Sequence, residues 1–251
     1  MKTYFQLLLL GIIMMHQVSC AQATLTQRNK YWNPNSGKYY FSTQLTWIYQ
    51  NDLAPDEYYK SGEMSIYVDT LSGTFLFTKE AYGWSGEMVD FVIADQKGNY
   101  IFGYSDEFGD KKREIMSPEQ YVDFAKMTKQ IQIDFKKNAK PTGRSKKFGK
   151  NDYGWPTKTG KEYVMSYEKT TDKNTIFISP IKYSFLPVFL FNKLNSEAKL
   201  PVNIDYSQVI PHRNMILEDT YIINNQTIKL SFQSQSPTEY FIDLNDYKKM
   251  N

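Results

Sequence analysis

The sequence predicts a β-rich α+β fold, in which a curved antiparallel sheet (a half-barrel or a sandwich-like sheet) carries one or two helices packed on it. The first observation is the aromatic content of 16%, with 20 Tyr and 16 Phe in 251 residues, which favours strands. The second is the alternation of apolar and polar residues along short segments that are separated by turn-forming residues. Strands and helices do not alternate in the manner of a doubly wound parallel sheet.

The alternating segments predict individual strands. Phe41, Leu45 and Trp47 fall on one face of the first of them, and the turn 69–73 and the Gly-bearing loop 95–99 predict two hairpins. Asn224-Asn225 predicts a further turn. The expected strands cover residues 41–49, 64–68, 75–77, 88–93, 100–102, 162–167, 175–179, 215–217, 221–223, 228–232 and 241–244.

One helix has a clear start signal. Ser117 is a suitable N-cap, Pro118 suits the first helical position, and Gln120 completes a capping box. Apolar residues then recur at spacings of three and four up to Phe135, although residues 131–133 fit an extended strand equally well. The most apolar later segment, 181–194, is expected to pack against the sheet as a core element.

The first nineteen residues have the pattern of a signal peptide: Lys2, then an apolar run too short to span a bilayer, then small residues. The single cysteine, Cys20, stands where a bacterial lipoprotein would be cleaved and lipidated, and a lone thiol is otherwise unusual in an exported chain. Cleavage at the nearby alanines would instead release a soluble protein. We expect an exported protein, either a lipoprotein of the bacterial outer membrane or periplasm or a secreted soluble one. Residues 20–38 would form a tether, and residues 39–251 a single domain.

Residues 136–161 break the strand pattern, because they are rich in Gly and Pro and carry nine Lys and Arg residues against one acid, Asp152. We predict a basic loop, in which the charge keeps a long exposed segment solvated. The functional alternative is that the loop contacts an anionic surface such as phospholipid headgroups. The candidate contact residues are Lys140, Arg144, Lys146, Lys147 and Lys150.

Several kinds of chemistry are excluded. After removal of the leader His212 is the one remaining histidine, so a multi-histidine zinc site cannot form, and there is no Gly-x-Ser-x-Gly elbow, Walker loop or Gly-x-Gly-x-x-Gly. We predict no metal, no cofactor and, with a net charge of +3, no nucleic-acid partner. Two acidic groups remain, 106–110 and Glu218-Asp219, and solvated turns explain them better than catalysis.

The signal ending at Cys20, the hairpin that starts at 61–69, the second hairpin ending at 100–102 and the re-entry 160–163 after the basic segment resemble a group of exported Bacteroidota proteins of unknown function. That group is thought to be similar in fold to the lipoprotein carrier LolA. The resemblance implies a curved antiparallel half-barrel with helices on its concave side over residues 55–250. The cysteine that often follows the re-entry glycine in such families is missing, and the resemblance implies no catalytic residues.

The expected function is that of a non-enzymatic cell-envelope protein that binds a lipid or other apolar ligand in the concave face of its sheet. The alternatives are a secreted hydrolase that uses a carboxylate pair at Asp106 and Asp110, and a structural or adhesive surface protein. The candidate ligand-lining residues are Trp47, Phe75, Phe77, Phe91 and Phe189.

Overall fold

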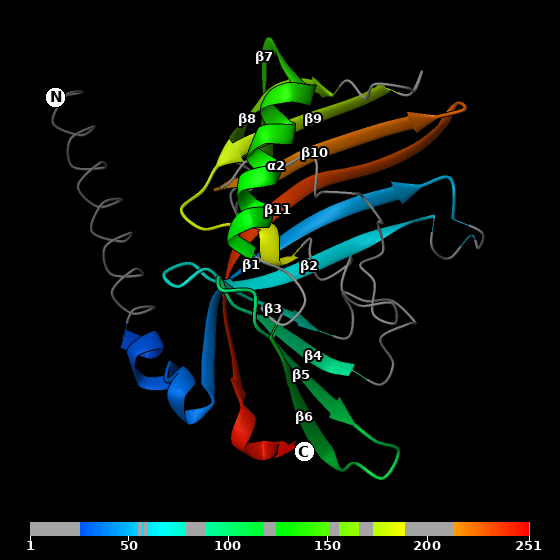
Figure 1. Ribbon diagram of the computed structural model, residues 1–251. Helices are drawn as coiled ribbons and strands as arrows, with labels where there is room; N and C mark the ends of the chain where they lie inside the picture. Colours follow the sequence, from blue (N-terminus) through cyan, green and yellow to red (C-terminus); the bar gives the residue numbers. More distant parts are fainter. Residues whose placement is uncertain are drawn as a thin grey trace, which may run out of the picture.

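The computed structural model describes residues 26–54, 57, 60–78, 89–117, 124–150, 156–165, 173–188 and 213–250. Within these ranges one helix of four turns, α2, accompanies twelve strands (Figure 1). The elements are η1 (Pro34–Ser36), β1 (Lys38–Asn51), β2 (Ser61–Asp69), β3 (Thr74–Thr78), β4 (Val89–Ala94), β5 (Tyr100–Ser105), β6 (Lys111–Met116), α2 (Phe124–Asn138), β7 (Ala139–Lys150), β8 (Pro156–Met165), β9 (Lys173–Pro180), β10 (Asn214–Ile223), β11 (Gln226–Asp243), η7 (Leu244–Asp246) and β12 (Lys248–Lys249).

The strands form one curved and mostly antiparallel sheet in the order β10-β9-β8-β7-β11-β1-β2-β3-β4-β5-β6-β12. The predicted β-rich α+β fold is therefore confirmed. The long strand β11 pairs with β1 along one edge, and with β10 and then β7 along the other. Strands β7, β8, β9, β10 and β11 therefore form a closed ring of pairings, which we call the five-strand ring. It occupies the upper part of Figure 1, and β3 to β6 occupy the lower part.

Apolar side chains fill both faces of the middle of the sheet. In β3, Phe75 and Phe77 belong to the main core, whereas Leu76 between them belongs to a second core on the opposite face. Phe41 and Leu45 of β1 would share a face in a regular strand, yet they belong to different cores. The pairing of β1 with β11 shifts register between Phe41 and Thr43, so this irregularity is where β1 passes from one core to the other.

An irregular segment and α2 cover the main core. Phe185, 1% exposed, packs its ring against Trp47 and Phe75, with centroids 6.1 and 4.9 Å apart. The Tyr100 hydroxyl donates a hydrogen bond to the Pro187 carbonyl at 2.6 Å, which fixes the same segment from β5. Helix α2 contributes Phe135, whose ring lies 5.2 Å from that of Tyr163 on β8. The apolar segment is therefore a core element over its described residues 181–188, as predicted.

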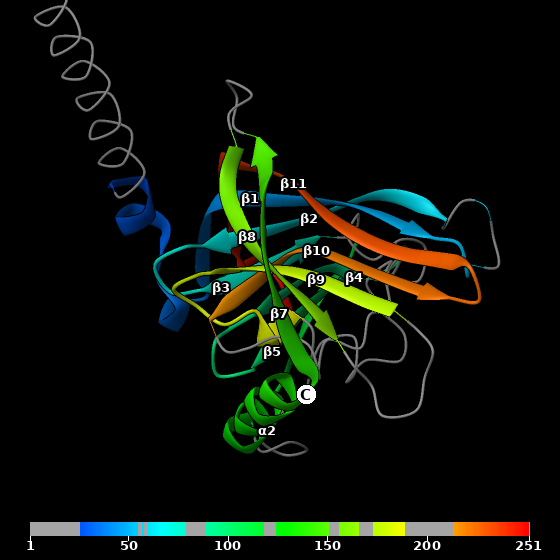
Figure 2. The same cartoon turned by 90° about the horizontal axis from the view of Figure 1, so that it is seen from above.

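The prediction of a basic loop over residues 136–161 is wrong. Helix α2 extends to Asn138, and its middle residues 131–133 are helical rather than extended. Strand β7 then runs on directly from the helix, and β8 returns beside it (Figure 2). Lysine and proline are unusual in central strands. One edge of β7 pairs with β8, but the other edge pairs only at Lys150, with Ser234 of β11, so β7 is an edge strand over most of its length. Both residue types are typical of edge strands, because they discourage pairing with another chain.

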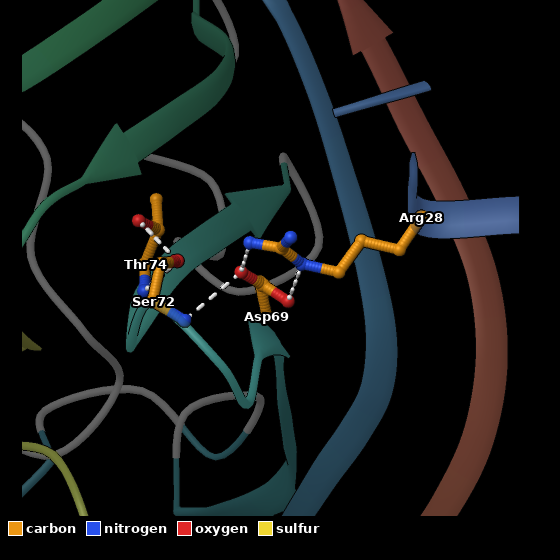
Figure 3. A network of polar contacts seen from close by, with 4 residues as sticks. All are labelled: Arg28, Asp69, Ser72 and Thr74. Atoms are coloured by element: carbon orange, nitrogen blue, oxygen red, sulfur yellow. Dashed lines mark hydrogen bonds and ion pairs between the residues drawn. The ribbon is translucent and has the colours of Figure 1, made fainter. Parts of the chain in front are cut away.

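A salt bridge anchors the described N-terminal end of the chain. Residues 26–31 are helical, and the Arg28 guanidinium donates from Nε and Nη2 to the two carboxylate oxygens of Asp69, both at 2.8 Å (Figure 3). The Ser72 backbone N–H donates to the same carboxylate at 3.0 Å. Burial alone would raise the pKa of Asp69, but the hydrogen bonds from Arg28 and Ser72 outweigh it and lower the pKa. None of the helices among the described residues is long and apolar enough to cross a bilayer.

Candidate functional site

The predicted ligand-lining residues do not form one open surface. Trp47, Phe75 and Phe77 meet in the main core, where each is at most 2% exposed. The Trp47 indole N–H donates to the Ile216 carbonyl at 3.0 Å, and Phe185 covers the neighbouring rings. Phe91 is equally buried but belongs to the second core, on the other face of the sheet. Phe189, and also Cys20 and His212, lie outside the described residues.

The five cationic candidates all lie on β7 and are all exposed. Strand β7 contains no acidic residue, and β8 contains one, Glu162, which is only 4% exposed. Of the neighbouring cations, Lys136, Lys137 and Lys161 are exposed as well, whereas Lys158 of β8 is half-buried. The described surface of the β7–β8 hairpin therefore presents cations without exposed carboxylates between them.

Two of these cations reach carboxylates that are buried beneath the hairpin. The Arg144 side chain, 72% exposed, forms a two-pronged ion pair with Glu162, in which Nη2 donates to Oε1 at 2.8 Å. The Lys146 ammonium, on a side chain 50% exposed, lies 2.8 Å from Oε2 of Glu218 on β10. Lys229 of β11 approaches the same oxygen at 3.5 Å. The second pair links β7 to β10, two strands that are not paired with each other, and so joins opposite parts of the five-strand ring.

Aromatic rings complete the surroundings of Lys146. Its Nζ lies 4.8 Å from the centroid of Phe148 and 5.7 Å from that of Phe177, and the two rings are 5.2 Å apart. Lys158 of β8 pairs in register with Phe148, and its burial lowers the pKa of its ammonium. The five-strand ring thus combines buried aromatic faces, the buried carboxylates of Glu162 and Glu218, and several cations.

A different carboxylate on β10 has no cationic partner among the residues that the structure describes. Asp219 is 1% exposed and pairs in register with Ile176 and Leu230, both of which belong to the main core. Burial raises its pKa to about 7, although the Asn174 amide partly opposes this by donating to Oδ1 at 3.0 Å. Neither the Asp219 Oδ2 nor the Asn174 Oδ1 has a hydrogen-bond partner among the described residues. Asp219 is therefore a carboxyl group that is protonated over much of the acidic range.

The acidic loop at 106–110 has the structure of a turn. Oδ1 of Asp106 accepts the backbone N–H groups of Phe108 and Asp110, at 3.0 and 2.9 Å, and Oδ2 lies 3.3 Å from the Lys112 ammonium. The backbone hydrogen bond from Asp110 is the main cause that lowers the pKa of Asp106. This carboxylate organises the loop, which agrees with the structural interpretation of the segment. In the described ranges no three His, Cys, Asp or Glu side chains gather closely enough to hold a metal ion.

Sequence reasoning found the cations but missed the carboxylates that they meet. Glu162 lies within an ordinary strand pattern, and Glu218 was considered only as half of an acidic pair. The sequence analysis therefore predicted burial for neither carboxylate. The available signal was an acid inside an otherwise apolar strand, such as Glu218 after Met215-Ile216-Leu217. No family model and no curated protein matches the chain. The resemblance to LolA-like envelope proteins therefore stays a prediction.

Proposed function

We propose that this protein is an exported, non-enzymatic protein of the cell envelope that binds anionic phospholipid surfaces through the β7–β8 hairpin. The observation that supports it is the separation of charge in the hairpin. The cations of β7 are exposed, whereas Glu162 and Glu218, the carboxylates that two of them meet, are buried. The chain as a whole carries only +3, so the hairpin concentrates positive charge that the rest of the molecule balances.

The expected strength of such binding follows from the number of cations. Each lysine or arginine near an anionic lipid surface contributes about 1 kcal/mol, and the contribution falls off within a Debye length. Lys140, Lys147 and Lys150 are exposed, and no carboxylate in the described part of the chain forms an ion pair with them. These three alone would contribute about 3 kcal/mol, on the same scale. The rigid hairpin holds them together, which a disordered loop of the same composition would not.

Export and lipidation form part of the proposal. The sequence pattern of residues 1–20 supports them, since a charged start, an apolar run and small residues precede Cys20. Intact-mass measurement of the mature protein would distinguish an acylated Cys20 from a chain that begins after it. A mature protein that retains residues 1–19 would contradict export.

A second candidate function is binding of a lipid or other apolar ligand over the main core. The observation that favours it concerns Phe185, which covers the rings of Trp47 and Phe75. Phe185 belongs to an irregular segment rather than to a strand. A ligand would have to displace Phe185 to reach those rings. Native mass spectrometry of protein purified without detergent tests this candidate, and the absence of any co-purifying lipid would count against it.

The hairpin proposal is tested by charge reversal. The variant K140E/K147E/K150E changes three exposed lysines on β7, and the matched control K97E/K248E/K249E changes three exposed lysines elsewhere by the same total charge. With vesicles rich in phosphatidylglycerol, the first variant should lose binding, because six units of charge at about 1 kcal/mol each are reversed at the contact surface. The control should bind within a few-fold of the unmodified protein. Equal loss in both variants would show that net charge, rather than the hairpin, controls binding.

A further inference from the structure

The strongest unassigned feature is the environment of the Lys146 ammonium. Three groups surround it: the carboxylate of Glu218 at 2.8 Å, the ring of Phe148 with its centroid at 4.8 Å, and the ring of Phe177 at 5.7 Å. The two rings meet at 60°, so they form two walls of a corner rather than a single flat surface. We call Phe148, Phe177 and Glu218 the cation cage.

The cage and its occupant differ in burial. Phe148 and Phe177 are 5% and 8% exposed, and the Glu218 side chain is 10% exposed. Three strands, β7, β9 and β10, hold these groups in place. The Lys146 side chain is 50% exposed and reaches the cage from the exposed strand β7. The ammonium can therefore leave for solvent by rotation of one flexible side chain, while the cage stays formed.

Aromatic faces beside a carboxylate are the surroundings in which proteins bind ammonium ligands, including quaternary ones. A ring corner needs no hydrogen-bond donor from the cation, so it accepts a methylated nitrogen as well as a lysine. In this protein Lys146 stands in for such a ligand.

We propose that the cation cage binds the ammonium of a phosphocholine-type headgroup and that Lys146 occupies the cage in its absence. In the exchange the headgroup nitrogen takes the position beside Glu218, and the displaced Lys146 pairs with the headgroup phosphate. One ion pair is replaced by two, and the net charge buried in the cage is unchanged. This inference goes beyond the proposed function, because a phosphocholine headgroup in a lipid carries no net charge and so differs from the anionic surface that the hairpin is proposed to bind.

The exchange explains why a zwitterion would be preferred over a simple cation. An intramolecular lysine competes for the cage at an effective concentration of roughly millimolar or more. A cation such as tetramethylammonium must overcome this competition without compensation. Phosphocholine compensates for the lost ion pair between Lys146 and Glu218, because its phosphate gives the released Lys146 a new partner.

The test uses the full chain and two soluble probes, tetramethylammonium and phosphocholine, titrated by calorimetry or by the shift of their methyl proton signals. Lys146→Ala removes the lysine that occupies the cage and leaves Lys229 in place, 3.5 Å from the same Glu218 oxygen. Lys97→Ala, at an exposed lysine outside the hairpin, is the matched control. We expect Lys146→Ala to bind tetramethylammonium at least about tenfold more tightly than the control, since the competing lysine is gone. Unmodified protein should prefer phosphocholine over tetramethylammonium, and Lys146→Ala should lose that preference.

Further variants distinguish a cage from a general change in charge. Adding Glu218→Gln to Lys146→Ala should remove the gain in tetramethylammonium binding. If Lys146→Ala does not fold, as judged by its circular dichroism and urea midpoint, Lys146→Gln takes its place. A folded Lys146 variant that binds tetramethylammonium no more tightly than Lys97→Ala would overturn the proposal.

Vesicles of phosphatidylcholine separate the two sources of the headgroup. Retention of the protein on them, reduced by Glu218→Gln, would assign the cage to a membrane lipid, and binding of free phosphocholine alone would assign it to a soluble ligand. Phosphatidylcholine vesicles carry no net charge, because the phosphodiester balances the ammonium, whereas phosphatidylglycerol vesicles are anionic. Loss of phosphatidylcholine binding with retained binding to anionic vesicles would contradict the cation cage alone. The opposite result would contradict the hairpin proposal alone, so the two failures are distinguishable.

Discussion

The two parts of the sheet hold their carboxylates in different ways. Around β2 to β6, the buried Asp69 receives a two-pronged ion pair from Arg28, and the turn carboxylate Asp106 stays at the surface beside Lys112. In the five-strand ring, Glu162 is buried beneath an exposed cation, and Asp219 is buried with only an amide for a partner. The comparison shows that burial alone does not set the sign of a pKa shift. Donors lower the pKa of Asp69, whereas their scarcity leaves the pKa of Asp219 raised to about 7.

The same difference determines the surface charge. Where carboxylates remain exposed, as at 106–110, they neutralise the lysines beside them. Where they are buried, as in the five-strand ring, the exposed cations of β7 have no exposed carboxylate beside them among the described residues. Burying acids is therefore how a chain of nearly balanced composition acquires a strongly basic hairpin.

The largest effect is expected from removal of the cation over Asp69. Arg28→Ala leaves a carboxylate that is 0% exposed without its main partner, and breaking such a pair costs about 3–5 kcal/mol of unfolding free energy. Urea unfolding followed by tryptophan fluorescence measures it. Lys30→Ala, an exposed residue of the same helical segment, is the control and should stay close to the unmodified protein. A loss for Arg28→Ala no larger than that of the control would show that the pair in Figure 3 contributes little.

The next effect is a dependence of stability on pH that has opposite signs for the two aspartates. The folded state raises the pKa of Asp219 from 3.8 to about 7, so it binds this proton more tightly than the unfolded chain does. The stability from Asp219 is therefore fully present below pH 4 and is lost as the pH rises toward 7. The lowered pKa of Asp69 acts in reverse, so its contribution is present above pH 4 and is lost at lower pH.

Asp219→Asn isolates the first of these contributions. The variant keeps a polar group of the same size but cannot ionise, so it should gain about 4 kcal/mol of stability at pH 8 and little at pH 4. Urea midpoints at several pH values measure this, with Asp246→Asn in the exposed η7 as the control. Identical slopes for the unmodified protein and Asp219→Asn between pH 4 and pH 7 would contradict the account of Asp219.

The smallest effect compares a cation over a buried acid with one over an exposed acid. Arg144→Ala leaves the 4% exposed carboxylate of Glu162 with fewer donors and should cost about 2 kcal/mol. Lys112→Ala, which removes the partner of the solvated Asp106, should leave the urea midpoint unchanged. Equal midpoints for the two variants would mean that burial of Glu162 is not what makes its ion pair matter.

Features fixed by neighbouring residues were predictable from the sequence. The alternation of apolar and polar residues predicted β1. Asn224-Asn225 predicted the turn between β10 and β11, where the two residues have positive φ angles of 48° and 65°. Strand β7 was missed because an edge strand is allowed the Lys, Pro and Gly that indicate a loop elsewhere. The burial of Glu162 and Asp219 depends on partners and packing far along the chain. Phe91 was predicted to line the same surface as Phe75, but the register of its strand places it on the opposite face of the sheet. Those contacts have no local signature.

The most direct test of the central claim, that exposed cations over buried carboxylates make the β7–β8 hairpin a binding surface, is the salt dependence of vesicle binding. The unmodified protein is sedimented with phosphatidylglycerol vesicles while the salt concentration is raised from about 50 mM to about 500 mM, which shortens the Debye length severalfold. We predict strong binding at low salt that weakens by more than about tenfold across this range, with K97E/K248E/K249E following the same curve and K140E/K147E/K150E unbound throughout. Absence of binding at low salt, or binding that is insensitive to salt, would contradict the claim.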